Sequence, residues 1–236
     1  MSNHSASTVD ATEALHGDRH LLERSGTAER VAAILRQRIT EGAFLPGTRL
    51  SEPPISAALG VSRNTLREAF QLLAHERLAV HELNRGVFVR ELTADDICDL
   101  YAVRRLVECG ALRRADELVD VDLAGVELAV ADGLSAAEAE EWRAMGIASI
   151  RFHQAVADLA ASERVSSTMR QVLAETRLFF VLAGNTRAFF EPYLARHQRI
   201  LRHLERGRFD VAEQALDRYL RDAEKQLLLA YRRRRS

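Results

Sequence analysis

The sequence has few of the features that mark a secreted or membrane-bound protein. It contains two cysteines, Cys98 and Cys109, which form no C-x-x-C pair. This scarcity argues against a disulfide framework and against a thiolate zinc knuckle. No apolar run approaches the length of about 20 residues that spans a bilayer. The first twenty residues lack the basic-then-apolar layout of a signal peptide. We therefore expect a cytoplasmic protein in a reducing compartment, with no membrane partner.

The sequence also lacks an excess of positive or of negative charge. The 33 Lys and Arg residues nearly balance the 34 Asp and Glu residues, and the formal net charge is −1. Bulk charge therefore cannot attract nucleic acid to this chain, and any DNA-binding surface has to be a local patch. Residues 28–91 hold nine arginines and seven glutamates, so the basic excess in that segment is small.

Proline is scarce and unevenly placed, with three of the four prolines in the first half. The polar residues 1–25 are predicted to be a disordered leader. Residues 26–92 change pattern quickly, and residues 93–232 have helical spacing almost throughout. The predicted fold class is mainly α, with a small N-terminal domain that contains a β-hairpin and a C-terminal all-α helical bundle. A length of 236 residues is sufficient for two such domains.

The segment 60–70 predicts a helix that begins after Ser62 and faces an anion. Ser62 suits the N-cap, and an i, i+3, i+4, i+7 spacing gives one apolar face, made of Leu66, Ala69, Phe70 and Leu73. The polar residues Arg63, Asn64 and Arg67 lie on the other faces. Positive charge near a helix start is unfavourable, and a phosphate or a base edge would offset it. Gly60 provides the tight turn after a preceding short helix.

Two β-prone runs, near Val80 and at 87–89, flank residues 84–86 and predict a hairpin. A helix, a turn, a polar-tipped helix and a hairpin in this order indicate a winged helix-turn-helix. Arginine pairs with guanine and asparagine with adenine in the major groove, whereas hydroxyl groups and backbone N–H groups suit phosphates. The alternative is an amphipathic helix with an ordinary solvated face.

The first half resembles the GntR family of bacterial repressors. The resemblance rests on PGTRLSE (46–52), LGVSRNTLREAF (59–70) and RGVFV (85–89). It implies a homodimer that binds a palindromic double-stranded DNA operator. It also implies DNA contacts from residues of the recognition helix and the wing, which here are Ser62, Arg63, Asn64, Thr65, Arg67, Arg85 and Gly86. Relatives often carry an arginine where this chain has Pro53, and Arg49 is the candidate to replace it.

The second half resembles the FCD effector domain of the FadR branch, through YAVRRLVE (101–108), RFHQAV (151–156), RHQRIL (196–201) and AEQALDRYL (212–220). In many relatives one aspartate and three histidines hold a divalent metal. The matching positions here are Ser149, His153, His197 and Tyr219. Serine and phenol are poor zinc ligands, so His153 and His197 are the two remaining candidate metal ligands, and no cofactor is certain.

Three interpretations of this interior remain open. The histidines are ordinary core residues satisfied by hydrogen bonds, or metal ligands, or the lining of a polar pocket that binds an effector directly. The third interpretation is preferred because unpaired polar groups inside a bundle are costly. Arg104 falls where relatives carry a pocket arginine, which suits a carboxylate. The predicted effector-binding residues are Arg104, Ser149, His153, Arg177, His197 and Tyr219.

No sequence motif indicates catalysis: a phosphate-cradling loop, a nucleophile elbow and an HExxH sequence are all missing. We therefore predict a ligand-responsive transcriptional regulator, a repressor, that is released from its operator or retuned by a small carboxylate, and not an enzyme. Two alternatives remain. One is a metal-responsive regulator, and the other is a helical-bundle enzyme or carrier without a DNA role.

Overall fold

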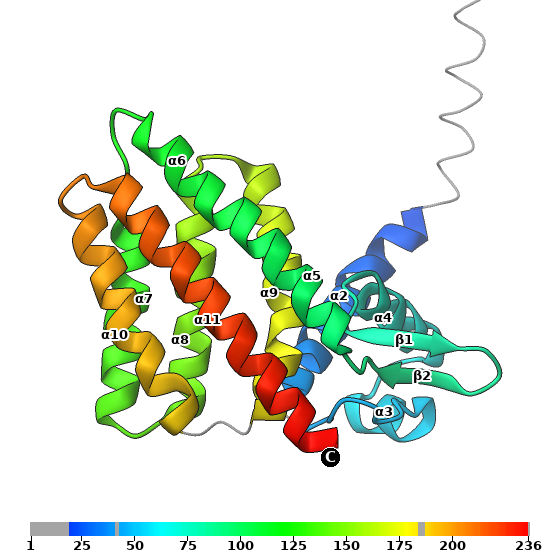
Figure 1. Ribbon diagram of the computed structural model, residues 1–236. Coiled ribbons are helices and arrows are strands. Elements are labelled where there is room, and N and C mark those ends of the chain that lie inside the picture. Colours follow the sequence, from blue (N-terminus) through cyan, green and yellow to red (C-terminus); the bar gives the residue numbers. More distant parts are fainter. Residues whose placement is uncertain (1–18, 41–42, 184–186, 236) are drawn as a thin grey trace, which may run out of the picture. The chain divides into compact units, whose positions relative to one another are not determined.

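The computed structural model describes residues 19–40, 43–183 and 187–235 (Figure 1). The chain divides into two compact units, with the boundary between Arg90 and Glu91. Residues 1–18 of the predicted leader lie outside the described residues. Arg19–Ser25, which the prediction also placed in the leader, instead form the first turns of a helix. Leucine, glutamate and arginine in this segment are good helix formers, and they extend the helix toward the N-terminus.

Over its described residues, 19–40 and 43–90, the first unit consists of three helices and one hairpin (Figure 1). Its elements are α2 (Arg19–Thr40), α3 (Glu52–Leu59), α4 (Arg63–His75), β1 (Ala79–Glu82) and β2 (Gly86–Val89). The buried residues described on α2 recur at helical spacing, and they are Ala28, Val31, Ala32, Leu35 and Ile39. This stripe packs on α4, whose own buried face is the predicted one, Leu66, Ala69, Phe70 and Leu73.

The predicted hairpin is confirmed as an antiparallel pair in which Ala79 lies opposite Val89 and Glu82 opposite Gly86. Asn84 and Gly86 take positive φ angles of 61° and 111° in and beside the turn. The chain segment 47–50 adds to the free edge of β2, since Leu50 N–H donates to the Val87 carbonyl at 2.8 Å. This extra pairing anchors the wing to the unit.

Among the described residues of the second unit, all regular secondary structure is helical. It consists of α5 (Ala94–Arg104), the π-helical turn η2 (Arg105–Cys109), α6 (Gly110–Asp116), α7 (Ala124–Glu138), α8 (Trp142–Asp158), α9 (Glu163–Ala183), α10 (Arg187–Leu204) and α11 (Phe209–Arg235). The segments α5, η2 and α6 follow one another without a break. Figure 1 shows α11 beside this run and beside α10.

Glycine inside a helical pattern suggests a break, but α7 continues through Gly133 to Glu138. The helix ends instead before Glu140, which has a φ of 55°. Gly133 permits close packing, because a Cβ at this position would lie 3.0 Å from Leu194 Cδ1 on α10. Proline is favoured in the first turn of a helix, but α10 begins at Arg187 and Pro192 lies inside it.

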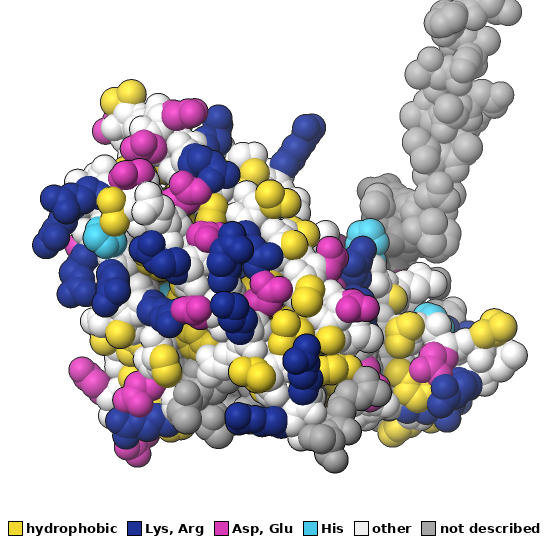
Figure 2. Space-filling model, viewed as in Figure 1, with side chains coloured by type: hydrophobic (Ala, Val, Ile, Leu, Met, Phe, Trp, Pro, Cys, Tyr) yellow, Lys and Arg dark blue, Asp and Glu magenta, His cyan; other side chains and the backbone are white. Residues whose placement is uncertain are grey.

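None of the described helices combines the length and the apolar character that crossing a membrane requires. In the view of Figure 2, basic and acidic side chains are interspersed over the helical unit. Its visible face therefore carries no large area of a single charge.

Candidate functional site

The N-terminus of α4 has the geometry that its sequence predicts. The Ser62 hydroxyl accepts a hydrogen bond from the Thr65 N–H at 3.1 Å, which is the N-cap interaction. The Ser62 and Thr65 hydroxyl groups lie 2.8 Å apart. The preceding turn is closed by Gly60, whose φ of 64° is left-handed, and by the Ser56 hydroxyl, which donates to the Val61 carbonyl at 2.6 Å. These contacts fix the direction in which α4 begins.

The residues predicted to contact DNA are exposed around this N-terminus. Arg63 and Asn64 are exposed on the first turn, and Thr65 is half-buried by its contact with Ser62. Arg67 lies one turn further along and is also exposed. Its Nε donates to Glu52 Oε1 at 2.9 Å, and this contact with α3 lowers the pKa of the Glu52 carboxyl. The unit therefore presents two arginines and an asparagine, of which Arg67 is already oriented by a carboxylate.

The wing brings Arg49 and Gly86 together. Arg49 lies opposite Phe88 in an isolated β-bridge. A Cβ placed on Gly86 would lie 3.3 Å from Arg49 Nε, so glycine permits this close approach. Arg85 pairs with Glu82 and its guanidinium lies 5.3 Å from the centre of the Phe88 ring. Arg49 and Arg85 are both exposed, so the hairpin carries two further cations on the same unit.

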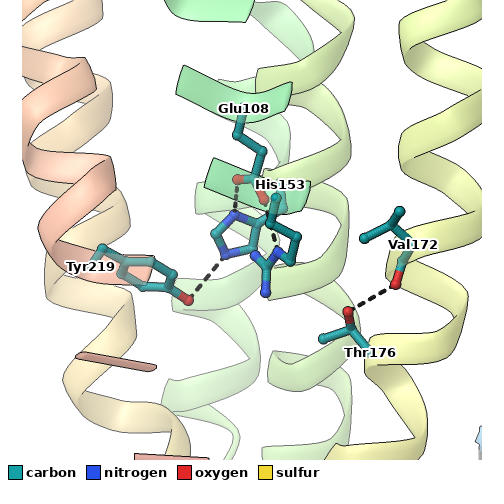
Figure 3. Close-up of polar contacts among 6 residues, drawn as sticks. Glu108, His153, Val172, Thr176 and Tyr219 are labelled. Atoms are coloured by element: carbon teal, nitrogen blue, oxygen red, sulfur yellow. Dashed lines mark hydrogen bonds and ion pairs between the residues drawn. The ribbon is translucent and has the colours of Figure 1, made fainter. Parts of the chain in front are cut away.

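A second group of functional interest lies inside the helical unit, where a buried carboxylate joins two cationic or basic side chains (Figure 3). Arg104 Nε donates to Glu108 Oε1 at 2.8 Å. The other oxygen, Glu108 Oε2, lies 2.6 Å from His153 Nδ1. Glu108 is 0 % exposed, and Arg104 and His153 are each 1 % exposed. Such groups are rarely buried unless they are paired.

This hydrogen-bonded chain continues to α11. His153 Nε2 lies 3.0 Å from the Tyr219 hydroxyl, and Ser149 is a further neighbour of Tyr219. The His197 ring stacks on Phe152, with ring centres 4.0 Å apart, and lies 5.4 Å from the His153 ring. We call Arg104, Glu108, Ser149, His153, His197 and Tyr219 the interior polar cluster. Its members come from α5, η2, α8, α10 and α11.

Burial determines the protonation states in this cluster. Burial lowers the pKa of His153 and lowers that of His197 well below its ordinary value, so both imidazoles are neutral. Burial raises the pKa of Tyr219 well above its ordinary value, so the phenol keeps its proton. Burial also raises the pKa of Glu108, but its contacts with His153 and Arg104 outweigh burial and leave that pKa below its ordinary value. Glu108 is therefore ionised.

These states fix the direction of each hydrogen bond. His153 donates from Nδ1 to the Glu108 carboxylate, which leaves Nε2 to accept from the Tyr219 hydroxyl. Two buried polar atoms of the interior polar cluster have no hydrogen-bond partner, Arg104 Nη2 and His197 Nε2. A buried donor without a partner is costly, and such an atom points to a water molecule or a ligand.

Sequence reasoning missed Glu108, the residue that links Arg104 to His153. A signal was present in YAVRRLVE, because Arg104 and Glu108 are four residues apart and lie on one side of a helix. Arg177, another predicted effector residue, lies half-buried on α9, next to Thr176. Thr176 itself donates to the Val172 carbonyl of its own helix at 2.8 Å (Figure 3).

The predicted metal ligands have no complete ligand set around them. Across the residues that the structure describes, no group of three or more His, Cys, Asp or Glu side chains is placed to hold a metal ion. His153 and His197 are close to each other, but the neighbouring positions are Ser149 and Tyr219.

Comparison with known proteins supplies the family. Residues 27–89 match the model described as bacterial regulatory proteins, gntR family, and residues 99–222 match the FCD domain. A solved GntR regulator structure from Rhodococcus sp. RHA1 is 47% identical and has a TM-score of 0.82, covering 86% of this chain and 98% of that one. The structure of E. coli McbR/YncC is 17% identical and has a TM-score of 0.75, covering 87% of this chain and 98% of that one, which shows a shared fold.

Curated relatives match over different lengths. The gluconate operon transcriptional repressor of Bacillus subtilis (strain 168) is 40% identical over 102 residues, which are 43% of this chain and 40% of the repressor. The chain thus matches about two fifths of that relative's length. The HTH-type transcriptional repressor RspR of Escherichia coli (strain K12) is 25% identical over 195 residues, or 82% of this chain and 86% of RspR. These relatives are transcriptional regulators and not enzymes.

Proposed function

We propose, since the chain belongs to the GntR family of bacterial regulatory proteins and carries an FCD domain, that it is a cytoplasmic, homodimeric repressor of transcription. In this proposal two copies of α4 enter the major groove of a palindromic operator, and the hairpins reach an adjoining groove. The observation that carries the proposal is the capped start of α4, where Arg63 and Asn64 are exposed beside the Ser62 cap.

The chemistry of this helix start matches what duplex DNA offers. An exposed arginine can pair bidentately with guanine, and an asparagine with adenine. Ser62 and Thr65 present hydroxyl groups and backbone N–H groups that suit a phosphate. Arg67, held by Glu52, is limited to fewer side-chain conformations before it meets DNA. Arg49, Arg85 and Gly86 would provide the wing contacts.

The interior polar cluster is proposed as the effector site. Arg104 keeps Nη2 without a partner, although its Nε is bonded to Glu108. A small carboxylate would accept from this free donor and would also come close to His197, Ser149 and Tyr219. Arg177 remains a proposed further contact. An effector changes DNA affinity only if it binds two arrangements of the protein with different affinity, so we propose that the carboxylate favours the arrangement that releases the operator.

The DNA proposal is tested by anisotropy with labelled fragments from upstream of the gene. Arg63→Ala combined with Asn64→Ala should weaken binding to the operator by at least about 1–3 kcal/mol, the usual value of one bidentate base contact. Circular dichroism should show that the fold is intact. Arg151→Ala is the matched control, because it also removes an exposed arginine, on α8. If the unaltered protein binds no fragment specifically, a helical-bundle enzyme or carrier becomes the better interpretation.

The effector proposal needs a separate measurement. Small carboxylates are screened for release of the protein from its operator, and hits are confirmed by calorimetry. Arg104→Lys, which keeps a cation beside Glu108 but removes the Nη2 donor, should abolish binding of the hit while operator binding persists. If a carboxylate binds the unaltered protein but operator affinity does not change, the proposed coupling is wrong, although the DNA-binding role would stand.

A further inference from the structure

Four positions that hold a divalent metal in many FCD domains meet in this chain with a different set of side chains. Ser149, His153, His197 and Tyr219 all belong to the interior polar cluster. The His153 and His197 ring centres are 5.4 Å apart, and the Tyr219 ring centre lies 5.0 Å and 5.2 Å from them. The backbone thus brings the four positions together as a metal site would require, and the question is whether the side chains fit an ion.

His153 has no nitrogen left for a metal. Its Nδ1 lies 2.6 Å from Glu108 Oε2. In metal sites a carboxylate often accepts a hydrogen bond from one imidazole nitrogen and so orients the other nitrogen toward the ion. The nitrogen that would then face the ion is Nε2. In this chain, however, Nε2 lies 3.0 Å from the Tyr219 hydroxyl, from which it accepts a hydrogen bond. A zinc ion would need that lone pair at about 2.0–2.1 Å.

Tyr219 does not replace the missing ligand. A phenol is not among the usual zinc ligands, and this hydroxyl lies 3.0 Å from His153 Nε2, to which it donates. Ser149 is a further neighbour of this hydroxyl. Ser149 carries a neutral hydroxyl at the position where many relatives have an aspartate that binds the metal.

We infer that the Tyr219 hydroxyl takes the place of a metal ion in this bundle, and that the chain Glu108–His153–Tyr219 joins the helices without a bound metal. The chain connects three elements, η2 through Glu108, α8 through His153 and α11 through Tyr219 (Figure 3). A structural ion would connect the same region through bonds to its ligands. These side chains therefore do not fit a metal ion, and their own hydrogen bonds connect the helices.

The first test uses protein purified without a His tag. Elemental analysis should find well below one divalent ion per chain, and calorimetric titration with Zn²⁺ should show no stoichiometric binding. The thermal unfolding midpoint should be the same with and without EDTA. One tightly held ion per chain, removed by EDTA with a fall in the midpoint, would overturn the inference. This result does not depend on whether the protein binds DNA.

The second test restores the ligand types. Ser149→Asp combined with Tyr219→His removes the hydroxyl from His153 Nε2 and offers four ligand side chains, with Glu108 still oriented toward Nδ1. This double variant should bind one Zn²⁺ per chain, give the d–d absorption of bound Co²⁺, and unfold at a lower temperature in EDTA. A folded double variant that takes up no metal would show that Tyr219 and Ser149 are not what excludes the ion. Tyr219→His alone serves if the double variant fails to fold.

The third test isolates the hydrogen bond. Tyr219→Phe removes the hydroxyl but adds no ligand, so its unfolding midpoint should fall and added Zn²⁺ should not restore it. Nitrogen NMR should report the Nδ1–H form of His153 in the unaltered protein and a changed Nε2 signal in the variant. Tyr193→Phe is the matched control, because that hydroxyl donates to Gln226 and not to His153. An unchanged His153 signal in Tyr219→Phe would contradict the proposed link.

Discussion

At the scale of single residues, Glu108 determines the arrangement of the helical interior. Its two carboxylate oxygens contact different partners, Arg104 and His153, and none of the three side chains is more than 2 % exposed. An ionised carboxylate in this position is tolerable only because a guanidinium and an imidazole N–H share it. The π-helical turn in which Glu108 lies is a feature that recurs at functional sites.

Glu108→Gln should therefore be strongly destabilising. The amide keeps the size of the side chain but leaves the Arg104 cation buried without a counter-charge, so we expect a loss of about 3–5 kcal/mol in the free energy of unfolding. Urea denaturation measures this loss. Asp132→Asn is the control, because it breaks an exposed pair with Arg151, and should cost at most about 1 kcal/mol. Equal losses in the two variants would show that Glu108 is not held as described.

The sequence predicted the apolar side of α4 and its cap better than it predicted the interior polar cluster. Ser62 and the buried face of α4 follow from local rules, namely capping preference and helical periodicity. Glu108 was not predicted to belong to the interior polar cluster, because a glutamate in a helix is exposed in most proteins. Its burial depends on Arg104 in the same helix and on His153, 45 residues later. Local patterns carry no information about such a distant partner.

At the scale of elements, Gly133 illustrates the same limit. In a sequence, glycine inside an apolar helical pattern suggests a break. In the fold it permits close packing of α7 on α10 and α8, since an added Cβ would lie 3.0 Å from Leu194 Cδ1 and 3.7 Å from Ala148 Cβ. The difference between a break and a packing site is set by neighbours that are distant in sequence. The boundary between α7 and α8 could therefore not be placed from the sequence.

Replacing glycine by alanine should have opposite effects at two helical positions. Gly110 has open surroundings, since an added Cβ would meet only Arg113 Nη2, at 3.9 Å. Gly110→Ala should stabilise the protein by about 0.5–1 kcal/mol through helix propensity. Gly133→Ala gains the same propensity but forces Leu194 to move, so it should be neutral or destabilising. Thermal and urea unfolding of both variants measure the difference, and an equal gain at the two positions would contradict close packing at Gly133.

At the scale of the whole molecule, the two units differ in how their charged side chains are distributed. The net charge is −1, and in the view of Figure 2 the helical unit carries both signs of charge interspersed. The first unit gathers exposed arginines on α4 and on the hairpin, including Arg63, Arg67 and Arg85. The two units meet between Arg90 and Glu91, and the sequence has helical spacing almost throughout from residue 93. Whether the proposed DNA affinity arises from these few placed cations can be measured directly.

The salt dependence of operator binding should distinguish the roles of these cations. Each phosphate contact contributes about −0.9 to the slope of log K against log salt concentration. Arg85 is exposed, and its contacts with Glu82 and with the Phe88 ring are weak at an exposed site, so it can turn to contact a phosphate. In a dimer, Arg85→Ala removes two such contacts and should make the slope shallower by about 2, with base preference unchanged. Arg63→Ala should instead relax the preference for one base pair. A slope unaffected by Arg85→Ala would mean that the wing does not contact the DNA backbone.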